Sequence, residues 1–548
     1  MNTRDSTVPL ESRVNLVPIR VIVRDVKGHP VANLRKEDFQ VFEDGKLQEI
    51  SHFSVETPAS LAQAFVRPES AAGATDPDPG KPVANFVPPS RFVALLFDDV
   101  HVNLRDLMRT RLAAIRFVDT SVQPTDRVAV FTISGQSEMD FTADRDKLHS
   151  ALLGLLPRPV VAGSSTGTGQ CPPVDYYQAD LIENKNDAIA LAVATQDALS
   201  CAFGNDPREL PAAKARAVSA AQQAYEAGEA QTTYSFRRLE EVLRRISALP
   251  GQRSLVLLSP GFIYPTREYD LSQIIDRANR SNVFINTLDA RGLYTPDLGD
   301  ISNPVDPGSP VAAGPRSTYR GQAQTAESDV LLVLADGTGG LAFRNSNDLA
   351  GGLGVIAGAP DVSYLIAFSP HNLKYDGKFH SLKVTLSAKE RLTVQARRGF
   401  YAPQHSISVE EEAKEEIEEA LFSQDVQHGL PVELHTQYYK INPANAKLAV
   451  MTHVDIGRIR FEKTADRNQD NLTIVAALFD RDGNIITGIE KTVEMHLRDA
   501  TLERLNHTGV TVKTSFDVKP GDYVIRLVVR DSNAARLSAE NGVVQIPY

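Results

Sequence analysis

The chain has 548 residues, of which 42% are hydrophobic and 23% are charged, a composition typical of folded domains. This length exceeds what one hydrophobic core supports, so we expect about three domains. The net charge of −11, with no basic arm or stripe, argues against nucleic acid as the main partner. No apolar run approaches the roughly 18 residues that span a bilayer, and the first residues lack the apolar region of a signal peptide.

The N-terminal segment, residues 14–56, has the pattern of a β module. Apolar residues mostly alternate with polar ones through Val14–Arg24, as in a half-buried strand. The run Phe39–Phe42 then meets Glu43–Lys46, whose glycine accepts the positive φ of a hairpin turn. Residues 57–90 are rich in Pro, Ala, Gly and Asp without periodicity and predict a linker.

Residues 91–357 alternate between strand and helix patterns. The unbroken apolar run Phe92–Phe97 predicts a strand buried on both faces, as in a parallel sheet. The alternation continues with helix 104–120, strand 127–133, helix 208–249, strand 254–258, helix 270–281, strand 283–288, helix 325–336 and strand 341–343. Strands separated by helices need right-handed crossovers. The predicted fold class is therefore α/β, doubly wound, with a mainly parallel sheet and helices on both faces.

Residues 158–205 interrupt this alternation and contain both cysteines, Cys171 and Cys201. The segment also holds Pro172, Pro173 and the glycine-rich run Gly163–Gly169, which together predict an irregular inserted loop. A disulfide would close this loop and would suit an oxidising compartment. The alternative is two unrelated buried thiols. The spacing of the two cysteines matches no zinc motif.

Beyond residue 357 the pattern returns to β. Residues 358–402 predict short strands, and 360–402 would complete the N-terminal module if the ends of the intervening domain lie close together. Residues 403–429 include a helical run that is acidic on every face, which predicts a solvated connector. Residues 430–548 have the alternating short strands of an immunoglobulin-like β-sandwich.

The strongest candidate site follows the strand 92–97, where Asp98 and Asp99 stand. Ligands of parallel sheets lie just beyond the carboxyl ends of the strands. Asp99, His101 and Asn103 occupy alternate positions and could hold a metal from one side of a loop. The alternative is that Asp98 and Asp99 cap the sheet edge or the following helix, a common local role of aspartate.

Four stretches of the chain, in a fixed order, carry a resemblance to a known family. They are Val14–Val17 with Val23–Val31 and Asp38–Gly45, then Leu95–Asp99, then Cys171–Asp180 with Ala190–Cys201, and last Ser363–Pro370 with Gly377–His380 and Val394–Tyr401. With them the chain resembles the von Willebrand factor A-related proteins of Acidobacteria, and residues 91–357 resemble a von Willebrand factor A domain. The resemblance implies export. Residues 430–548 lie outside it.

The resemblance also implies a metal-ion-dependent adhesion site, in which oxygen ligands hold Mg²⁺ and leave one position for a partner's carboxylate. The first aspartate of the family pattern falls on Asp98. Its threonine falls on Thr232 or Thr233, just before the helix that ends at Leu249.

The other three ligand positions of that pattern are lost in this chain. Val100 and Val102 stand where the family has serines, and Pro260, beside Ser259, stands where it has the second aspartate. We therefore expect a degenerate site, of low metal affinity or metal-free, at which Mg²⁺ or Ca²⁺ is the candidate ion.

Two further motifs are weaker. Asp466–Asp470 has the oxygen spacing that opens a calcium loop, but Asn471 and Ala477 replace the required glycine and glutamate, so we expect a solvated turn between strands. Ser259 stands at a strand end without a visible base, which argues against nucleophilic catalysis.

These patterns predict a non-enzymatic, adhesion-type binding protein of the cell envelope or exterior. A protein partner would dock near Asp98, Asp99, His101, Thr233 and Ser259, beside the inserted loop. One alternative is a metal-dependent hydrolase at Asp98, Asp99 and His101, which needs a further ligand and a base. Another is a purely structural component of the envelope.

Overall fold

The computed structural model describes residues 17–26, 30–56, 65–66, 88–158, 171–293, 313–358, 362–370, 378–387, 392–402, 409–422, 426–464 and 466–547. The chain divides into two compact units. Residues 1–58 and 360–407 form the first, here the N-terminal unit. Residues 59–359 and 408–548 form the second, which contains an α/β domain (described from 88 to 358) and a C-terminal domain (from 409 to 547).

The N-terminal unit is built from two antiparallel four-stranded sheets, ordered β14-β1-β12-β4 and β15-β13-β2-β3. The strands are β1 (Val17–Arg24), β2 (Phe39–Glu43), β3 (Lys46–Gln48), β4 (Ile50–Glu56), β12 (Ser363–Phe368), β13 (Phe379–Leu386), β14 (Thr393–Gln395) and β15 (Gly399–Tyr401). Segments from both sides of the α/β domain thus pair within one unit. Its core includes the buried Tyr364, whose hydroxyl donates to the Val31 carbonyl at 2.6 Å.

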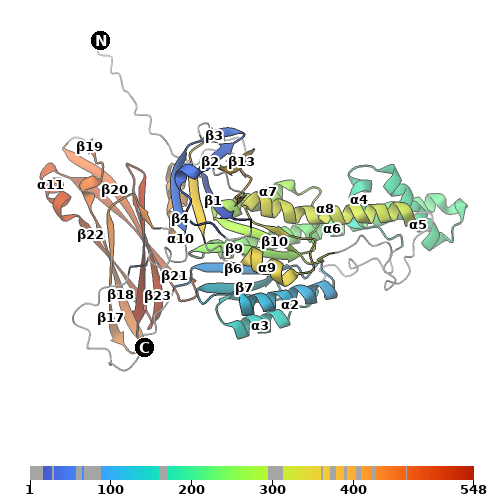
Figure 1. The fold of residues 1–548 in the computed structure, drawn as a ribbon, viewed down its shortest axis with the longest axis horizontal. Coiled ribbons are helices and arrows are strands. Elements are labelled where there is room, and N and C mark those ends of the chain that lie inside the picture. Colours follow the sequence, from blue (N-terminus) through green and yellow to red (C-terminus); the bar gives the residue numbers. More distant parts are fainter. Residues whose placement is uncertain are drawn as a thin grey trace, which may run out of the picture. The chain divides into compact units, whose positions relative to one another are not determined.

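The α/β domain has a six-stranded sheet in the order β11-β10-β9-β6-β7-β8 (Figure 1). Five strands are parallel, and the edge strand β8 is antiparallel to β7. The strands are β6 (Arg91–Phe97), β7 (Asp126–Thr132), β8 (Glu138–Thr142), β9 (Gln252–Ser259), β10 (Val283–Asp289) and β11 (Ala342–Phe343). This sheet confirms the predicted α/β class with mainly parallel pairing. The seven residues of β6 are all buried, as the unbroken apolar run requires.

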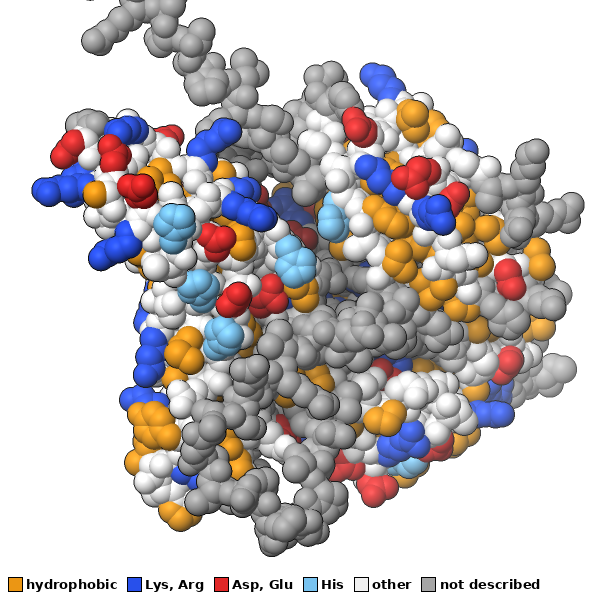
Figure 2. Space-filling view, turned by 60° about the vertical axis from the view of Figure 1, so that its left-hand side comes forward, with side chains coloured by type: hydrophobic (Ala, Val, Ile, Leu, Met, Phe, Trp, Pro, Cys, Tyr) orange, Lys and Arg blue, Asp and Glu red, His pale blue; other side chains and the backbone are white. Residues whose placement is uncertain are grey.

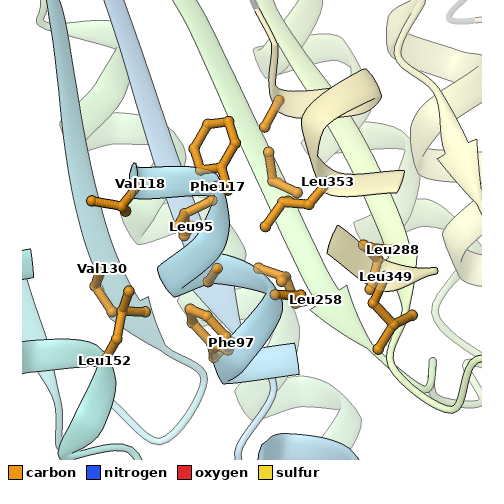
Figure 3. Packing of buried hydrophobic residues seen from close by; sticks show 14 of the residues in the cluster. Leu95, Phe97, Phe117, Val118, Val130, Leu152, Leu258, Leu288, Leu349 and Leu353 are labelled. Atoms are coloured by element: carbon orange, nitrogen blue, oxygen red, sulfur yellow. The ribbon is translucent and has the colours of Figure 1, made fainter. Parts of the chain in front are cut away.

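Helices cover both faces of this sheet (Figure 1). One face carries α2 (Leu104–Thr120), α3 (Arg145–Leu153) and α9 (Leu349–Ala357). Figure 3 shows the packing there: Leu95 of β6 lies beside Phe117 of α2, and Phe97 of β6 and Leu353 of α9 belong to the same buried cluster. The other face carries α6 (Leu210–Ser247), α7 (Glu268–Arg280) and α8 (Ala313–Thr338).

The predicted inserted loop is helical where it is described. It forms α4 (Tyr176–Glu183) and α5 (Ala188–Phe203), which pack on the N-terminal part of α6. The prediction of an irregular segment was wrong there because Ala190, Ala194 and Ala198 recur every four residues and meet a similar alanine stripe on α6. Cys171 and Cys201 form the predicted disulfide. The run Gly163–Gly169 lies outside the described residues.

The C-terminal domain contains two antiparallel sheets that share one core. The larger has β16-β24-β23-β20-β19 with β21 on β20, and the smaller has β17-β18-β22. Its elements are β16 (Gln427–His428), β17 (Val432–Asn442), β18 (Asn445–Val454), β19 (Glu462–Thr464), β20 (Arg467–Phe479), β21 (Ile485–Leu497), α11 (Asp499–Thr508), β22 (Val510–Val518), β23 (Gly521–Asp531) and β24 (Arg536–Ile546). Leu448, Phe516 and Ile474 are among the side chains buried between the sheets. The short β5 (Phe65–Val66), within the predicted linker, pairs with β24.

The acidic helix α10 (Val409–Phe422) is not a solvated connector, as its composition had suggested. Ile417, Ala420 and Leu421 form an apolar stripe that packs against β20, β23 and β24. The Arg530 guanidinium donates to Glu416 at 2.8 Å, so part of the acidic surface is used in pairing. The stripe is short and lies among glutamates, which hides it in the sequence.

The C-terminal domain contacts the α/β domain at the amino ends of the parallel strands. Arg127, at the start of β7, pairs with Asp482 at 3.0 Å. Gly483 leaves no room for a side chain, because a Cβ there would lie 2.3 Å from the ring of Phe92. This interface is therefore at the opposite end of the strands from Asp98 and Asp99.

No helix in the described part of the chain combines the length and the hydropathy needed to cross a bilayer. On the described surface visible in Figure 2, basic and acidic side chains are interspersed, and several histidine side chains lie near one another on the left-hand part of the view.

Candidate functional site

Asp98 is fully buried at the carboxyl end of β6 and is surrounded by protein donors. Its Oδ1 accepts from the backbone N–H groups of Val100 at 3.1 Å and His101 at 2.9 Å. The His101 Nδ1 lies 3.0 Å from both carboxylate oxygens. The Ser259 hydroxyl, from the end of β9, donates to Oδ2 at 2.5 Å and itself accepts from the N–H of Gly261 at 2.9 Å.

Asp98 and His101 favour each other's charged forms. Burial alone would raise the pKa of Asp98, but the charge and hydrogen bond of His101, with the Ser259 hydrogen bond, lower it below its usual 3.8. Burial likewise opposes the charge on His101, but Asp98 raises the pKa of the imidazole above 6.5. The side chain of His101 is 17% exposed and its ring stacks on Phe262 at 5.5 Å. The pair is therefore an imidazolium–carboxylate ion pair at slightly acidic pH.

This ion pair predicts a defined pH dependence of stability. The raised pKa of His101 contributes stability that is complete below pH 6.5 and is lost as the pH rises through the folded-state value. The lowered pKa of Asp98 contributes stability that is present above pH 3.8 and is lost as the pH falls through its folded-state value. The contribution is thus greatest between these two pH values. We expect the free energy of unfolding, measured by urea titration, to fall between pH 6 and pH 9 by more in the wild type than in His101→Asn, which keeps a donor without the titration. An equal fall in both would contradict the ion pair.

Asp99 points to a different strand from Asp98. Its two carboxylate oxygens accept from the Ser134 N–H at 2.9 Å and the Ser134 hydroxyl at 2.5 Å, at the end of β7. Burial raises the pKa of Asp99, although the Ser134 hydrogen bonds favour the ionised form. Asp99 therefore ties β6 to β7, while Asp98 ties β6 to β9.

The remaining predicted residues have local structural contacts. Asn103 is the N-cap of α2 and accepts from the Asp106 N–H at 2.9 Å. Thr232 is buried and donates to the Ile263 carbonyl at 2.7 Å, in the loop after β9, while Thr233 donates to the Glu229 carbonyl of its own helix. The prediction that these threonines precede a helix was wrong, because α6 begins at Leu210 and both lie within it.

Several residues at this edge were not predicted. Ser134 follows its strand as Asp98 does, so strand-end position was an available signal. Glu327 on α8 lies 3.4 Å from Arg291, and burial raises its pKa to about 7 even though Arg291 and His101 favour its ionised form. Glu327 lies within an ordinary helical pattern, so the sequence gave no sign that it would be near this edge.

Glu229 of α6 connects the helical insertion to this edge. It accepts from the Tyr176 hydroxyl of α4 at 2.5 Å, from Thr266 at 2.8 Å and from Arg267 at 3.2 Å, the last two in the loop between β9 and α7. Burial and the bond to Glu229 raise the pKa of Tyr176, which keeps the phenol protonated as the donor. The insertion is thus held beside the loop that carries Phe262 and Ser259.

The carboxylate oxygens at this edge are not arranged as the ligands of a magnesium ion. Octahedral Mg²⁺ needs several free oxygen ligands around one point. Asp98 already accepts from Val100, His101 and Ser259, and Asp99 from Ser134. Among the described residues, the one group of three potential metal ligands that come together is Glu43, Asp44 and His380 in the N-terminal unit. There His380 Nδ1 lies 2.9 Å from Glu43 and 3.2 Å from Asp44.

No family model matches the chain, and no curated protein matches it. Among solved structures, an aerotolerance-related membrane protein from Bacteroides fragilis is similar over 49% of this chain and 97% of its own, at 12% identity and a TM-score of 0.23. The conserved hypothetical protein BatB from Bacteroides thetaiotaomicron covers 48% of this chain and 95% of its own, at 12% identity and a TM-score of 0.22. The type V pili tip protein Mfa5 from Porphyromonas gingivalis covers 91% and 78%, at 9% identity and a TM-score of 0.19. These values assign no function.

Proposed function

We propose that the chain is a non-enzymatic binding protein of the cell envelope or exterior, whose von Willebrand A-like domain binds a protein partner without a metal. The partner docks at the carboxyl-end edge of the parallel sheet. The observation that carries the proposal is that Asp98 and Asp99 are buried and bonded to protein donors, so they shape this edge rather than ligate. The hydrogen bonds of Asp98 and Asp99 fix the loops after β6, β7 and β9 relative to one another.

In this proposal the imidazolium of His101 stands where an adhesion site of this type has its metal ion. The His101 Nδ1 is within hydrogen-bond distance of both carboxylate oxygens of Asp98, and the imidazole ring stacks on Phe262. The positive charge of the imidazolium then balances the buried carboxylate of Asp98. The partner is recognised by the side chains on the surface around this pair.

That surface offers exposed apolar side chains on the elements that follow the strands. Leu104, the first residue of α2, is 53% exposed, and Leu293, shortly after β10, is 63% exposed. Tyr234 of α6 is 37% exposed, and its hydroxyl donates to the Ser134 carbonyl. Aromatic and aliphatic anchors of this kind are typical of protein-binding surfaces. The C-terminal domain contacts the α/β domain at the other end of the strands.

The hydrolase alternative receives less support. Ser259 is fully buried and donates its proton to Asp98, so it is not placed as a nucleophile. Asp98 and Asp99 bond to different strands and do not converge on one reacting position. A purely structural role remains an outcome of the binding test.

Capture of partners from an envelope extract tests the proposal. The edge variant Leu104→Glu with Leu293→Glu is compared with Leu112→Glu, a 58%-exposed leucine on the same helix two turns from the edge. We expect the edge variant, which replaces two anchors, to lose at least about tenfold in captured partner, because the loss of one good contact already costs about that much. The control and the wild type should capture equally, with or without EDTA. Equal capture by edge variant and control, or capture that EDTA abolishes, would contradict the proposal.

A further inference from the structure

Three side chains that can ligate a metal meet in the N-terminal unit. Glu43 is the last residue of β2, Asp44 begins the turn to β3, and His380 lies on β13, which pairs with β2. The His380 Nδ1 lies 2.9 Å from Glu43 Oε1 and 3.2 Å from Asp44 Oδ2. One ligand atom from each residue lies within 4.8 Å of those of the other two. Segments from both sides of the α/β domain thus form one group, here the His380 cluster.

The hairpin turn after β2 brings the two carboxylates to the same side. In a regular strand, neighbouring side chains point to opposite faces of the sheet. Here Glu43 pairs with Lys46, so Asp44 and Gly45 form a two-residue turn, with φ of +47° and +78°. Because the backbone turns at Asp44, its carboxylate reaches the same imidazole nitrogen as the carboxylate of Glu43.

Neighbouring groups hold the His380 cluster in this arrangement. Asp44 Oδ1 accepts from the Ser381 N–H at 2.9 Å and from the Ser381 hydroxyl at 3.1 Å, which directs Oδ2 towards His380. The imidazole ring stacks on the ring of Phe400, with 5.2 Å between the centroids. Contacts of this kind orient the ligands of metal sites in proteins. The three ligand atoms are therefore oriented before an ion binds.

The imidazole alone does not balance the charge of the His380 cluster. Two carboxylates meet at Nδ1, which carries one proton at most. An imidazolium balances one of the two negative charges, whereas a divalent cation beside a neutral imidazole balances both. The side chains of Glu43 and His380 are only 10% and 11% exposed, so an unbalanced charge is costly there. The side chain of Asp44 is 52% exposed, which leaves a path for an ion and for water.

The separations of the ligand atoms suit a small transition-metal ion. Around a tetrahedral zinc ion with bonds of about 2.0–2.1 Å, neighbouring ligand atoms lie about 3.3 Å apart. The two distances from His380 Nδ1, 2.9 Å and 3.2 Å, are close to that value. One imidazole nitrogen with two carboxylate oxygens also suits zinc better than magnesium or calcium, which prefer oxygen ligands throughout.

We propose that Glu43, Asp44 and His380 bind a zinc ion, with water as the fourth ligand. The ion takes the place of the Nδ1 proton of His380, which is released to solvent when the imidazole is protonated. The bound ion connects the β2–β3 hairpin to β13 and stabilises the N-terminal unit. This site is separate from the binding edge of the α/β domain, so the two proposals succeed or fail independently.

Isothermal titration of Zn²⁺ into the full chain at neutral pH tests this site. We expect saturable binding of one ion, weakened at least about tenfold in Glu43→Gln, Asp44→Asn and His380→Gln, because each removes one ligand. Asp44 is the exposed member of the cluster, so Asp44→Asn is the variant that disturbs folding least. The matched control is His435→Gln, because His435 lies 3.3 Å from Glu433 in an exposed pair without a third ligand. This control should bind zinc as the wild type does.

The same titrations give the results that would overturn the proposal. A wild type without saturable zinc binding would mean that His380 is only an ion-pair partner of the two carboxylates. Binding that persists unchanged in Asp44→Asn and Glu43→Gln would place the ion elsewhere. An excess of Mg²⁺ should leave zinc binding unchanged, and displacement of zinc by magnesium would contradict the assignment to a nitrogen-containing site.

Discussion

Replacement of Asp98 by alanine is expected to lower the free energy of unfolding by about 3–5 kcal/mol, the usual cost of removing one partner of a buried ion pair. The substitution leaves the His101 imidazole, the Ser259 hydroxyl and two backbone N–H groups without their acceptor. Each is a buried or half-buried donor, and unpaired buried donors carry the full cost of desolvation. Urea titration followed by circular dichroism measures the change.

Asp144→Ala is the matched control for that substitution. Asp144 also accepts two backbone N–H bonds, from Asp146 and Lys147, but it caps α3 at the surface with 43% of its side chain exposed. We expect this variant to lose about 1 kcal/mol. Equal losses in the two variants would mean that Asp98 is only a local cap, and that the network with His101 and Ser259 adds little.

Gly261→Ala should have an effect of similar size for a different reason. Gly261 has φ of +91°, and a Cβ there would lie 2.0 Å from the Glu327 carbonyl oxygen of α8. Left-handed backbone strain and overpacking each cost about 1–3 kcal/mol, so we expect a total loss of about 3–5 kcal/mol. The clash should also displace the loop that carries Ser259 and Phe262. Partner capture is therefore expected to fall together with stability.

Gly204→Ala separates the effect of backbone strain on stability from the effect of the clash. Gly204 ends α5 with φ of +58°, and a Cβ there would meet nothing within 4 Å. The control has the backbone strain without the clash, and we expect it to lose about 1 kcal/mol. Calorimetric unfolding of both variants gives the comparison. If Gly261→Ala were no worse than this control, α8 would not pack against the loop after β9 as closely as the structure shows.

The sequence predicted those features that depend on neighbours along the chain. The apolar run Phe92–Phe97 has one simple explanation, a strand buried on both faces, and β6 is that strand. Placing Asp98 at the edge of the sheet followed from the same run. The disulfide was predicted because both cysteines stand in one inserted segment.

The features that were missed depend on contacts between distant segments. The insertion is helical because alanines on α5 meet alanines on α6, and such a stripe has no strong hydrophobic signal of its own. The solvated turn expected at 466–470 was wrong for the same reason, because β20 begins at Arg467 and Asp470 pairs with Met495 of β21, further along the chain. The apolar stripe of α10 is visible only once its sheet is known. Within the candidate site, Glu327 was missed for the same reason, since it acts through Arg291 on another element, whereas the strand-end position of Ser134 was a signal that could have been used.

Isothermal titration of Mg²⁺ and Mn²⁺ into the wild type and Asp98→Asn tests the central claim most directly. The account predicts no saturable binding that the Asp98 substitution removes, because His101 and Ser259 already occupy that carboxylate. Saturable binding that disappears in Asp98→Asn would contradict the account and would make the edge a metal site after all.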